Sequence, residues 1–100
     1  MALPPPRSHR ITLAEAAEQT GRRPNKALKG GMFLRKDLDD LLAQPGCSGL
    51  RFYYGQDKSG ASSLILVGVD ADGNDMEDGV LMDVHYPCPP VCGDANSLNT

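Results

Sequence analysis

The sequence predicts an α+β fold, with two short helices packed on a small antiparallel three-stranded meander and extended proline-rich termini. The first half of the chain contains two helical patterns, and the second half contains alternating or β-rich apolar runs. Prolines cluster near both ends. Because the chain has 100 residues, of which 40% are hydrophobic and 5% aromatic, we expect one small core.

We expect three parts: a flexible proline-rich arm over residues 1–10, a single α+β domain over 11–86, and a C-terminal tail with proline and cysteine over 87–100. The arm contains three consecutive prolines, which lack amide donors and favour extended backbone. No apolar run is long enough to span a membrane, and the arm has no hydrophobic segment of a secretory signal. The expected location is therefore the cytoplasm.

A first helix is predicted from Leu13 to Gln19. Thr12 stands three residues before Glu15, which is the spacing of a capping box. The alanine-rich stretch that follows consists of good helix formers, and Gly21 is expected to lie just beyond the helix end.

A second helix is predicted over residues 35–43, because leucines recur there at helical spacing. Gln44-Pro45-Gly46 is expected to end it. The leucines expected on its inner face are Leu38, Leu41 and Leu42, and the residues expected to pack against them are Phe52, Tyr54, Ile65 and Val67.

Three strands are predicted in the second half. The first has Leu50, Phe52 and Tyr54 at alternate positions, the second is the apolar run 63–69, and the third is Val80 to Val84. Two turn segments rich in Asp, Gly and Ser separate them. From Tyr86 onward, repeated prolines are expected to prevent any regular element.

The three cysteines leave several interpretations open. Cysteine thiolates and one imidazole are suitable ligands for a tetrahedral zinc site, two cysteines can instead form a disulfide, or all can remain reduced. We expect the tail to dock through Tyr86, Val91 and its prolines with the thiols mostly buried, and no cofactor to be required. The candidate zinc ligands are Cys47, His85, Cys88 and Cys92.

Charge is distributed unevenly, although the net charge is only −3. A basic run consists of Arg22, Arg23, Lys26, Lys29, Arg35 and Lys36. An acidic run consists of Asp70, Asp72, Asp75, Glu77, Asp78 and Asp83. The basic run lacks interleaved aromatic residues, so a nucleic-acid partner is not expected. Either the runs are solvated faces or they meet, within one protomer or between copies.

No constellation in the sequence indicates catalysis. The segment 70–75 departs from a calcium-binding loop because its glycine stands at position 4, and position 12 from Asp70 is Leu81. Neither a phosphate-binding loop nor a nucleophile elbow is present. We therefore do not expect an enzyme.

Three segments resemble a group of small uncharacterised bacterial proteins. They are the stretch from Leu41 to Tyr53, which contains Pro-Gly-Cys-Ser-Gly-Leu-Arg, the segment Leu66-Val67-Gly68-Val69-Asp70, and the tail Cys88-Pro89-Pro90-Val91-Cys92. The similarity covers residues 32 to 93 and implies a bacterial cytosolic protein with one compact unit. It implies no activity, ligand or catalytic residue.

By elimination, the sequence predicts a non-enzymatic protein-interaction or self-assembly module, whose partner is another copy of the chain or another protein. The free edges of a three-stranded sheet and the separated charges favour a homo-oligomer. The alternative is a zinc-binding or thiol-redox-responsive protein that uses the C-terminal cysteines.

Overall fold

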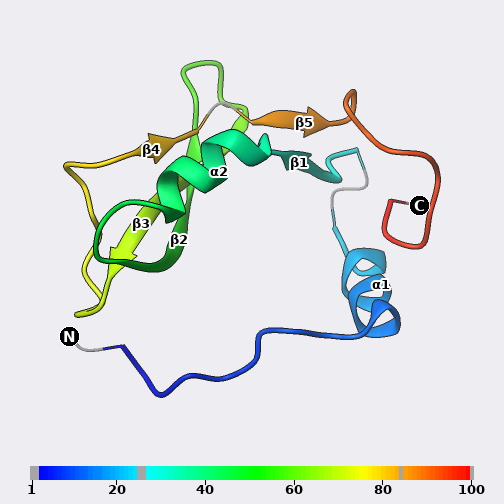
Figure 1. Cartoon of the computed structure of the whole chain (residues 1–100). Helices are drawn as coiled ribbons and strands as arrows, with labels where there is room; N and C mark the ends of the chain where they lie inside the picture. The colour runs from blue at the N-terminus through cyan, green and yellow to red at the C-terminus, as the bar shows by residue number, and fades with distance from the viewer. Residues whose placement is uncertain (1–2, 25–26, 84, 100) are drawn as a thin grey trace. The chain divides into compact units, whose positions relative to one another are not determined.

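The structure, a computed structural model, describes residues 3–24, 27–83 and 85–99 (Figure 1). Over these residues it confirms the α+β class, with two helices, a three-stranded antiparallel sheet and an additional two-stranded sheet. In chain order the elements are α1 (Leu13–Gly21), β1 (Gly30–Met32), α2 (Arg35–Leu42), β2 (Cys47–Gln56), β3 (Ser62–Asp70), β4 (Leu81–Met82) and β5 (Tyr86–Cys88).

The chain divides into two compact units. Unit 1 contains Phe33–His85 together with the segment that ends at Pro5, and unit 2 contains Pro6–Met32 and Tyr86–Thr100. The predicted domain over residues 11–86 coincides with neither unit, because unit 2 combines segments from both ends of the chain.

Unit 1 is built on the antiparallel sheet with strand order β2-β3-β4. The pairing of β2 with β3 sets Phe52 opposite Leu66 and Arg51 opposite Val67. Since side chains alternate between the two faces of a strand, Phe52 and Val67 lie on opposite faces. The predicted core, which placed them together, was therefore wrong, and Phe52 and Tyr54 are instead 51% and 84% exposed.

The buried apolar residues described in unit 1 come from α2 and β3. They are Leu41, Leu66, Val67 and Val69. Burial on both faces of β3 agrees with the central position predicted for this strand. The next residue after Leu41 points about 100° away around the helix, so Leu42 is 47% exposed, contrary to the prediction.

The side chain of Gln44 joins the end of α2 to the segment before β4. Its Nε2 donates to the carbonyl oxygen of Leu41 at 2.8 Å, and its Oε1 accepts from the backbone N–H of Val80 at 2.9 Å. Two glycines leave room for it: a Cβ added at Gly79 would lie 2.1 Å from Oε1, and one added at Gly68 would lie 3.0 Å from Nε2. Through Gln44, the bend after α2 therefore also holds the backbone at Val80, immediately before β4.

The third strand is shorter than predicted. The strand β4 contains only two residues, with Leu81 opposite Val67 and Met82 opposite Leu66. The predicted end of this strand, Val84, lies outside the described residues.

Unit 2 contains α1 and the β1·β5 pair. The predicted capping box is confirmed, because the Thr12 hydroxyl accepts from the Glu15 backbone N–H at 3.1 Å and the Glu15 carboxylate accepts from the Thr12 N–H at 3.1 Å. The helix includes Gly21 and is capped by Arg22 rather than ending before the glycine.

The tail does form a regular element, contrary to the prediction. Pro87 lies within β5, opposite Gly31 of β1. A two-stranded ladder has two outer edges, so a residue without an N–H is tolerated where its nitrogen faces away from the partner strand. The prolines therefore shorten the strand without preventing it.

Candidate interaction surface and thiol site

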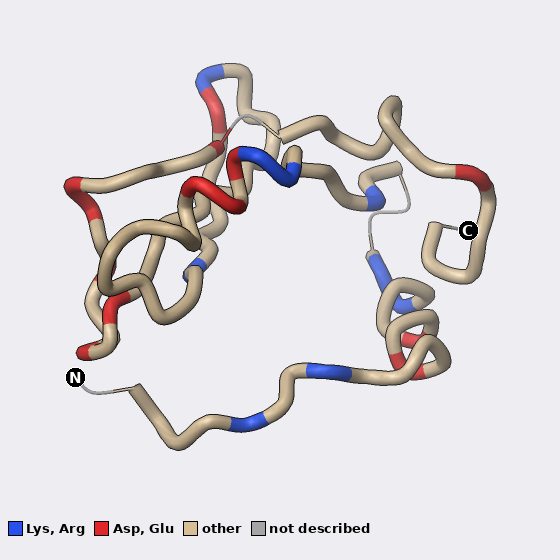
Figure 2. The backbone as a smooth tube through the Cα atoms, viewed as in Figure 1, with Lys and Arg blue, Asp and Glu red and all other residues tan. Residues whose placement is uncertain are grey.

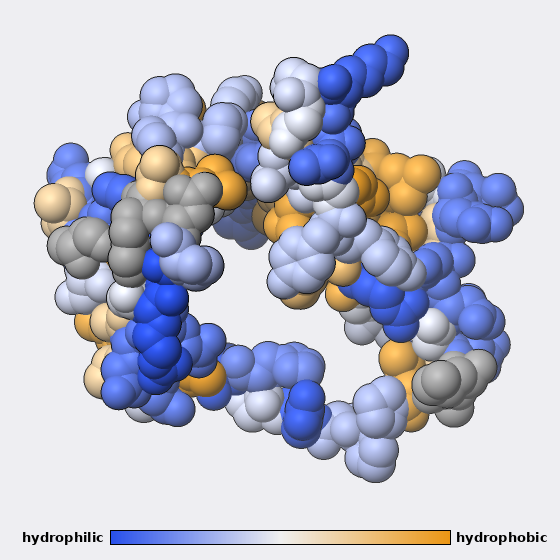
Figure 3. All heavy atoms as spheres, turned by 180° about the vertical axis from the view of Figure 1, so that it is seen from behind, coloured by the Kyte–Doolittle hydropathy of each residue, from blue (hydrophilic) through white to orange (hydrophobic). Residues whose placement is uncertain are grey.

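The strand β2 presents apolar side chains to solvent at the edge of the sheet. It is ten residues long and, among the described strands, pairs with β3 alone. Leu50, Phe52 and Tyr54 share one face of it, and the rings of Phe52 and Tyr54 meet edge to face with centroids 5.6 Å apart. We call these three residues the β2 stripe. The sequence analysis placed Phe52 and Tyr54 in the core, but both are exposed, as is Leu50. Apolar side chains reach the surface in the view of Figure 3.

The opposite face of β2 contains a polar cluster of Arg51, Tyr53 and Asp75. The Arg51 guanidinium forms an ion pair with one carboxylate oxygen of Asp75, and the Tyr53 hydroxyl donates to the other. A second Arg51 nitrogen donates to the carbonyl oxygen of Gly73 at 3.2 Å. The cluster thus attaches the turn after β3 to the edge strand.

The three groups of this cluster affect one another's titration. The Tyr53 hydrogen bond and the adjacent Arg51 charge lower the pKa of Asp75 below its ordinary value. The same hydrogen bond to a carboxylate raises the pKa of Tyr53, and that of Arg51 is raised by its hydrogen bond to Asp75. All three groups therefore keep their usual protonation at neutral pH, which is the behaviour of a structural cluster rather than of an acid-base pair.

The predicted basic run is divided between elements. Arg35 and Lys36 begin α2 and pair with Asp39 and Asp40 one turn later, at 3.3 and 3.1 Å (Figure 2). Arg22 lies 3.9 Å from Glu18, and Arg23 donates to the Leu98 carbonyl oxygen at 3.4 Å. The remaining members are Lys29, which is exposed before β1, and Lys26, which lies outside the described residues.

The predicted acidic run begins at Asp70, the last residue of β3, and continues to Asp83 in the segment that follows (Figure 2). Asp70 accepts backbone N–H groups of Asp72 and Asn74, so it shapes its own turn. Asp75 belongs to the polar cluster described above. The side chains of Asp72, Glu77, Asp78 and Asp83 are exposed. Within unit 1, Arg35 and Lys36 therefore pair with carboxylates of α2 itself and not with the acidic run.

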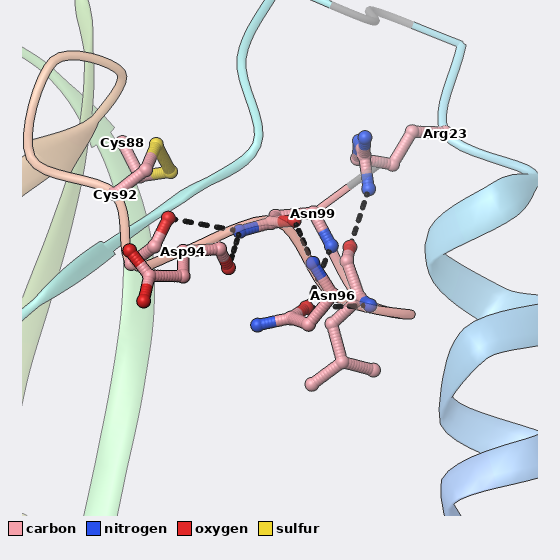
Figure 4. Close-up of a disulfide and its surroundings, with 8 residues drawn as sticks. Arg23, Cys88, Cys92, Asp94, Asn96 and Asn99 are labelled. Carbon is pink, nitrogen blue, oxygen red and sulfur yellow. Dashed lines mark hydrogen bonds between the residues drawn. A yellow bond between two sulfur atoms is a disulfide. The ribbon is translucent and has the colours of Figure 1, made fainter.

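The cysteines adopt one of the alternatives that the sequence left open. Cys88 and Cys92 form a disulfide with Cα atoms 4.9 Å apart (Figure 4). Cys47 is free and half-buried, and its Sγ donates to the Gly49 carbonyl oxygen at 3.1 Å. Tyr86, Val91 and Cys92, which were expected to be buried with the tail, are exposed, and Cys88 is half-buried.

The four predicted zinc ligands are divided between the two units, with Cys47 and His85 in unit 1 and Cys88 and Cys92 in unit 2. His85 is half-buried, with its ring 5.9 Å from that of Phe33, and two of the three predicted thiolates bond to each other instead. The predicted site would need its cysteines as free thiolates. Across residues 3–24, 27–83 and 85–99, no three His, Cys, Asp or Glu side chains are grouped so as to hold a metal ion.

Comparison with known proteins finds no match: no family model, no curated protein and no solved structure is similar to this chain. In the described part of the chain, no helix has the length and apolar character needed to cross a membrane.

The polar cluster is the main site feature that the sequence analysis missed. Asp75 was grouped with the acidic run, and Arg51 and Tyr53 were given no role. Their alternation with the β2 stripe does place them on one face. The contact with Asp75 depends on the return of the chain after β3, which no local pattern encodes.

Proposed function

We propose that this chain is a non-enzymatic self-assembly module in which β2 of one copy pairs with β2 of a second copy. The observation that supports this proposal is a long edge strand whose outer edge has no partner among the described strands and which carries an exposed apolar stripe. Unpaired backbone N–H and C=O groups along such an edge are a template for another strand.

The edge has few of the features that prevent strand pairing. Natural edge strands are usually short, contain proline or charged residues, or are twisted by bulges. Residues 50–56 contain no proline, and their one charged side chain, Arg51, is engaged by Asp75 on the face opposite the stripe. The bulge in this strand lies at its start, between Cys47 and Gly49.

The pattern of the stripe is self-complementary. An antiparallel pairing centred on Phe52 sets Phe52 opposite its own copy, and sets Leu50 of one copy opposite Tyr54 of the other. Such aromatic and aliphatic cross-strand pairs stabilise a sheet. A second copy therefore fits the stripe better than a charged partner would, and two three-stranded sheets would become one of six strands.

The test is the molar mass of the protein by light scattering at high micromolar concentration. We expect the wild-type chain to be a dimer and Phe52→Lys to be a monomer, because two lysines would face each other across the pairing. Tyr54→Lys is the second variant, since an 84% exposed side chain contributes little to folding of the protomer.

The matched control is Leu81→Lys, which changes another exposed apolar residue of the same sheet, on β4. It should leave the dimer intact, and circular dichroism should show all variants folded. A monomeric wild-type protein, or a Tyr54→Lys variant that remains a dimer, would contradict the proposal.

A thiol-redox-responsive protein is the second candidate function, and the Cys88–Cys92 disulfide supports it over the zinc alternative. In cytosolic proteins most disulfides are transient and serve catalysis or redox sensing. With the expected cytoplasmic location, this bond is of the reversible kind.

A further inference from the structure

We infer that the Cys88–Cys92 pair is a thiol–disulfide exchange site whose oxidation orders the β1·β5 sheet. This inference deepens the thiol-redox candidate and is independent of pairing through β2. Its substrate class is a small dithiol or a dithiol protein that reduces the bond.

The disulfide lies directly at the end of the strand it would control. Cys88 is the last residue of β5 and pairs with Gly30 of β1, while its carbonyl oxygen accepts the Lys29 N–H at 3.0 Å. Cys92 follows four residues later. The bond therefore closes a small loop on the last rung of the ladder.

The β1·β5 sheet is short and largely exposed. All three residues of β1 are exposed and two of them are glycines, which lose the most backbone freedom on ordering. In β5 only Cys88 is partly buried, and Pro87 has no N–H to donate. An isolated pair of strands is at best marginally stable in water. We therefore expect the covalent closure beside it to contribute to the order of the segment.

Within the loop, the backbone is arranged by the same closure. The Val91 N–H donates to the Pro87 carbonyl oxygen at 2.8 Å, and the Cys92 N–H to that of Pro90 at 3.1 Å. Beyond the disulfide, the Asn99 side chain donates to the Asp94 carbonyl oxygen at 3.1 Å, and the Asn96 side chain accepts from the Leu98 N–H at 2.8 Å (Figure 4). The hydrogen-bonded part of the tail after residue 92 thus follows directly on the loop that the disulfide closes.

Exposure selects the sulfur that is attacked. Cys92 is exposed and Cys88 is partly buried, so a reductant reaches Sγ of Cys92 first. A thiolate of the dithiol forms a bond to this sulfur, the Sγ–Sγ bond breaks, and Cys88 leaves as a thiolate that takes a proton from water. The second thiol of the reductant then attacks the mixed disulfide and releases Cys92 as a thiol. Two electrons pass to the protein, and the reductant becomes a disulfide.

The test is amide hydrogen exchange of the full chain, oxidised and then reduced with dithiothreitol. Reduction should accelerate exchange of the Lys29 amide by about tenfold or more, because its partner carbonyl belongs to Cys88. The Met76 amide, which donates to the Gly68 carbonyl oxygen at 2.8 Å within unit 1, should be unaffected and is the internal reference.

Two variants complete the experiment. Cys88→Ser/Cys92→Ser without reductant should match the reduced wild-type chain, and Cys47→Ser should respond to reductant as the wild-type chain does. Unchanged protection of Lys29 on reduction would overturn the inference. So would alkylation of all three cysteines in air-oxidised protein, since the disulfide would then be absent. Neither result concerns the β2 pairing, which light scattering tests separately.

Discussion

At the scale of single residues, Asp75 fixes the path of the chain after β3. Its two carboxylate oxygens accept from Arg51 and from Tyr53, which lie two positions apart on one face of β2. A β-bridge from Val69 to Asp75 brings the carboxylate to this face. One acidic side chain therefore joins a turn to an edge strand, while the stripe on the other face stays exposed.

The pH dependence of this contact follows from the pKa of Asp75, which is held below its ordinary value of 3.8 by the Tyr53 hydrogen bond and then by Arg51. A carboxylate whose pKa is lower in the folded chain stabilises the fold above the unfolded pKa, and this contribution is lost as the pH falls through the folded value. Asp75→Asn should therefore lower the thermal midpoint at neutral pH, and the difference from wild type should vanish in strong acid.

Thermal melts followed by circular dichroism at neutral pH and at about pH 2 measure this difference. Asp72→Asn is the control, because Asp72 is an exposed residue of the same turn. An equal effect of the two substitutions would show that the cluster does not stabilise the fold.

At the scale of elements, the orientation of the short helix α2 on the sheet follows from the burial of one leucine. Leu41 is fully buried, Leu38 is half-buried and Leu42 is largely exposed. The helix contacts both β2 and β3, and Gln44 joins its end to the segment before β4. The face of α2 that meets the sheet is therefore narrower than the leucine spacing suggests.

Substitution of adjacent leucines tests this orientation. Leu41→Ala should lower the free energy of unfolding by about 2–5 kcal/mol, the usual cost of removing a buried leucine side chain. Leu42→Ala removes a side chain that already contacts water and should cost about 1 kcal/mol or less. Urea denaturation measures both, and similar losses for the two variants would mean that the helix is rotated relative to the structure.

At the scale of the whole molecule, one chain forms two small units, and different interactions stabilise each of them. Unit 1 has an apolar core contributed by α2 and β3, whereas unit 2 combines a capped helix, a short ladder and a disulfide. The charged runs that the sequence suggested as contacts are partly used within elements, as in α2. An apolar edge, rather than complementary charge, is therefore the basis proposed for assembly.

The salt dependence of dimer formation distinguishes assembly through the apolar edge of β2 from assembly through the charged runs. Raising the ionic strength from about 0.01 M to about 1 M shortens the screening length from about 30 Å to about 3 Å. A dimer formed through β2 has no charged pair across the contact. The fraction of the protein that sediments as a dimer should therefore be the same at low and at high salt. Dissociation at high salt would place the contact at the basic and acidic runs instead.

Local chemistry accounts for the parts of the fold that the sequence predicted well. The capping box of Thr12 and Glu15 involves residues three apart, and the leucine spacing places α2 within a residue of its bounds. Both patterns are satisfied by contacts within one or two turns of chain. The same holds for Asp70, whose carboxylate closes its own turn. The α+β class follows from these local preferences.

Contacts between distant segments decided the rest. The face on which each β2 side chain lies depends on the register with β3, and Leu50, Phe52 and Tyr54 are exposed although Phe52 and Tyr54 were predicted to be buried. The alternation in β2 is compatible with either face being inward. Likewise, β5 exists because residues more than fifty positions away supply its partner strand, and the pairing of Cys88 with Cys92 was one of several that three cysteines allow. Such contacts depend on where the backbone returns, and residue spacing alone leaves that undetermined.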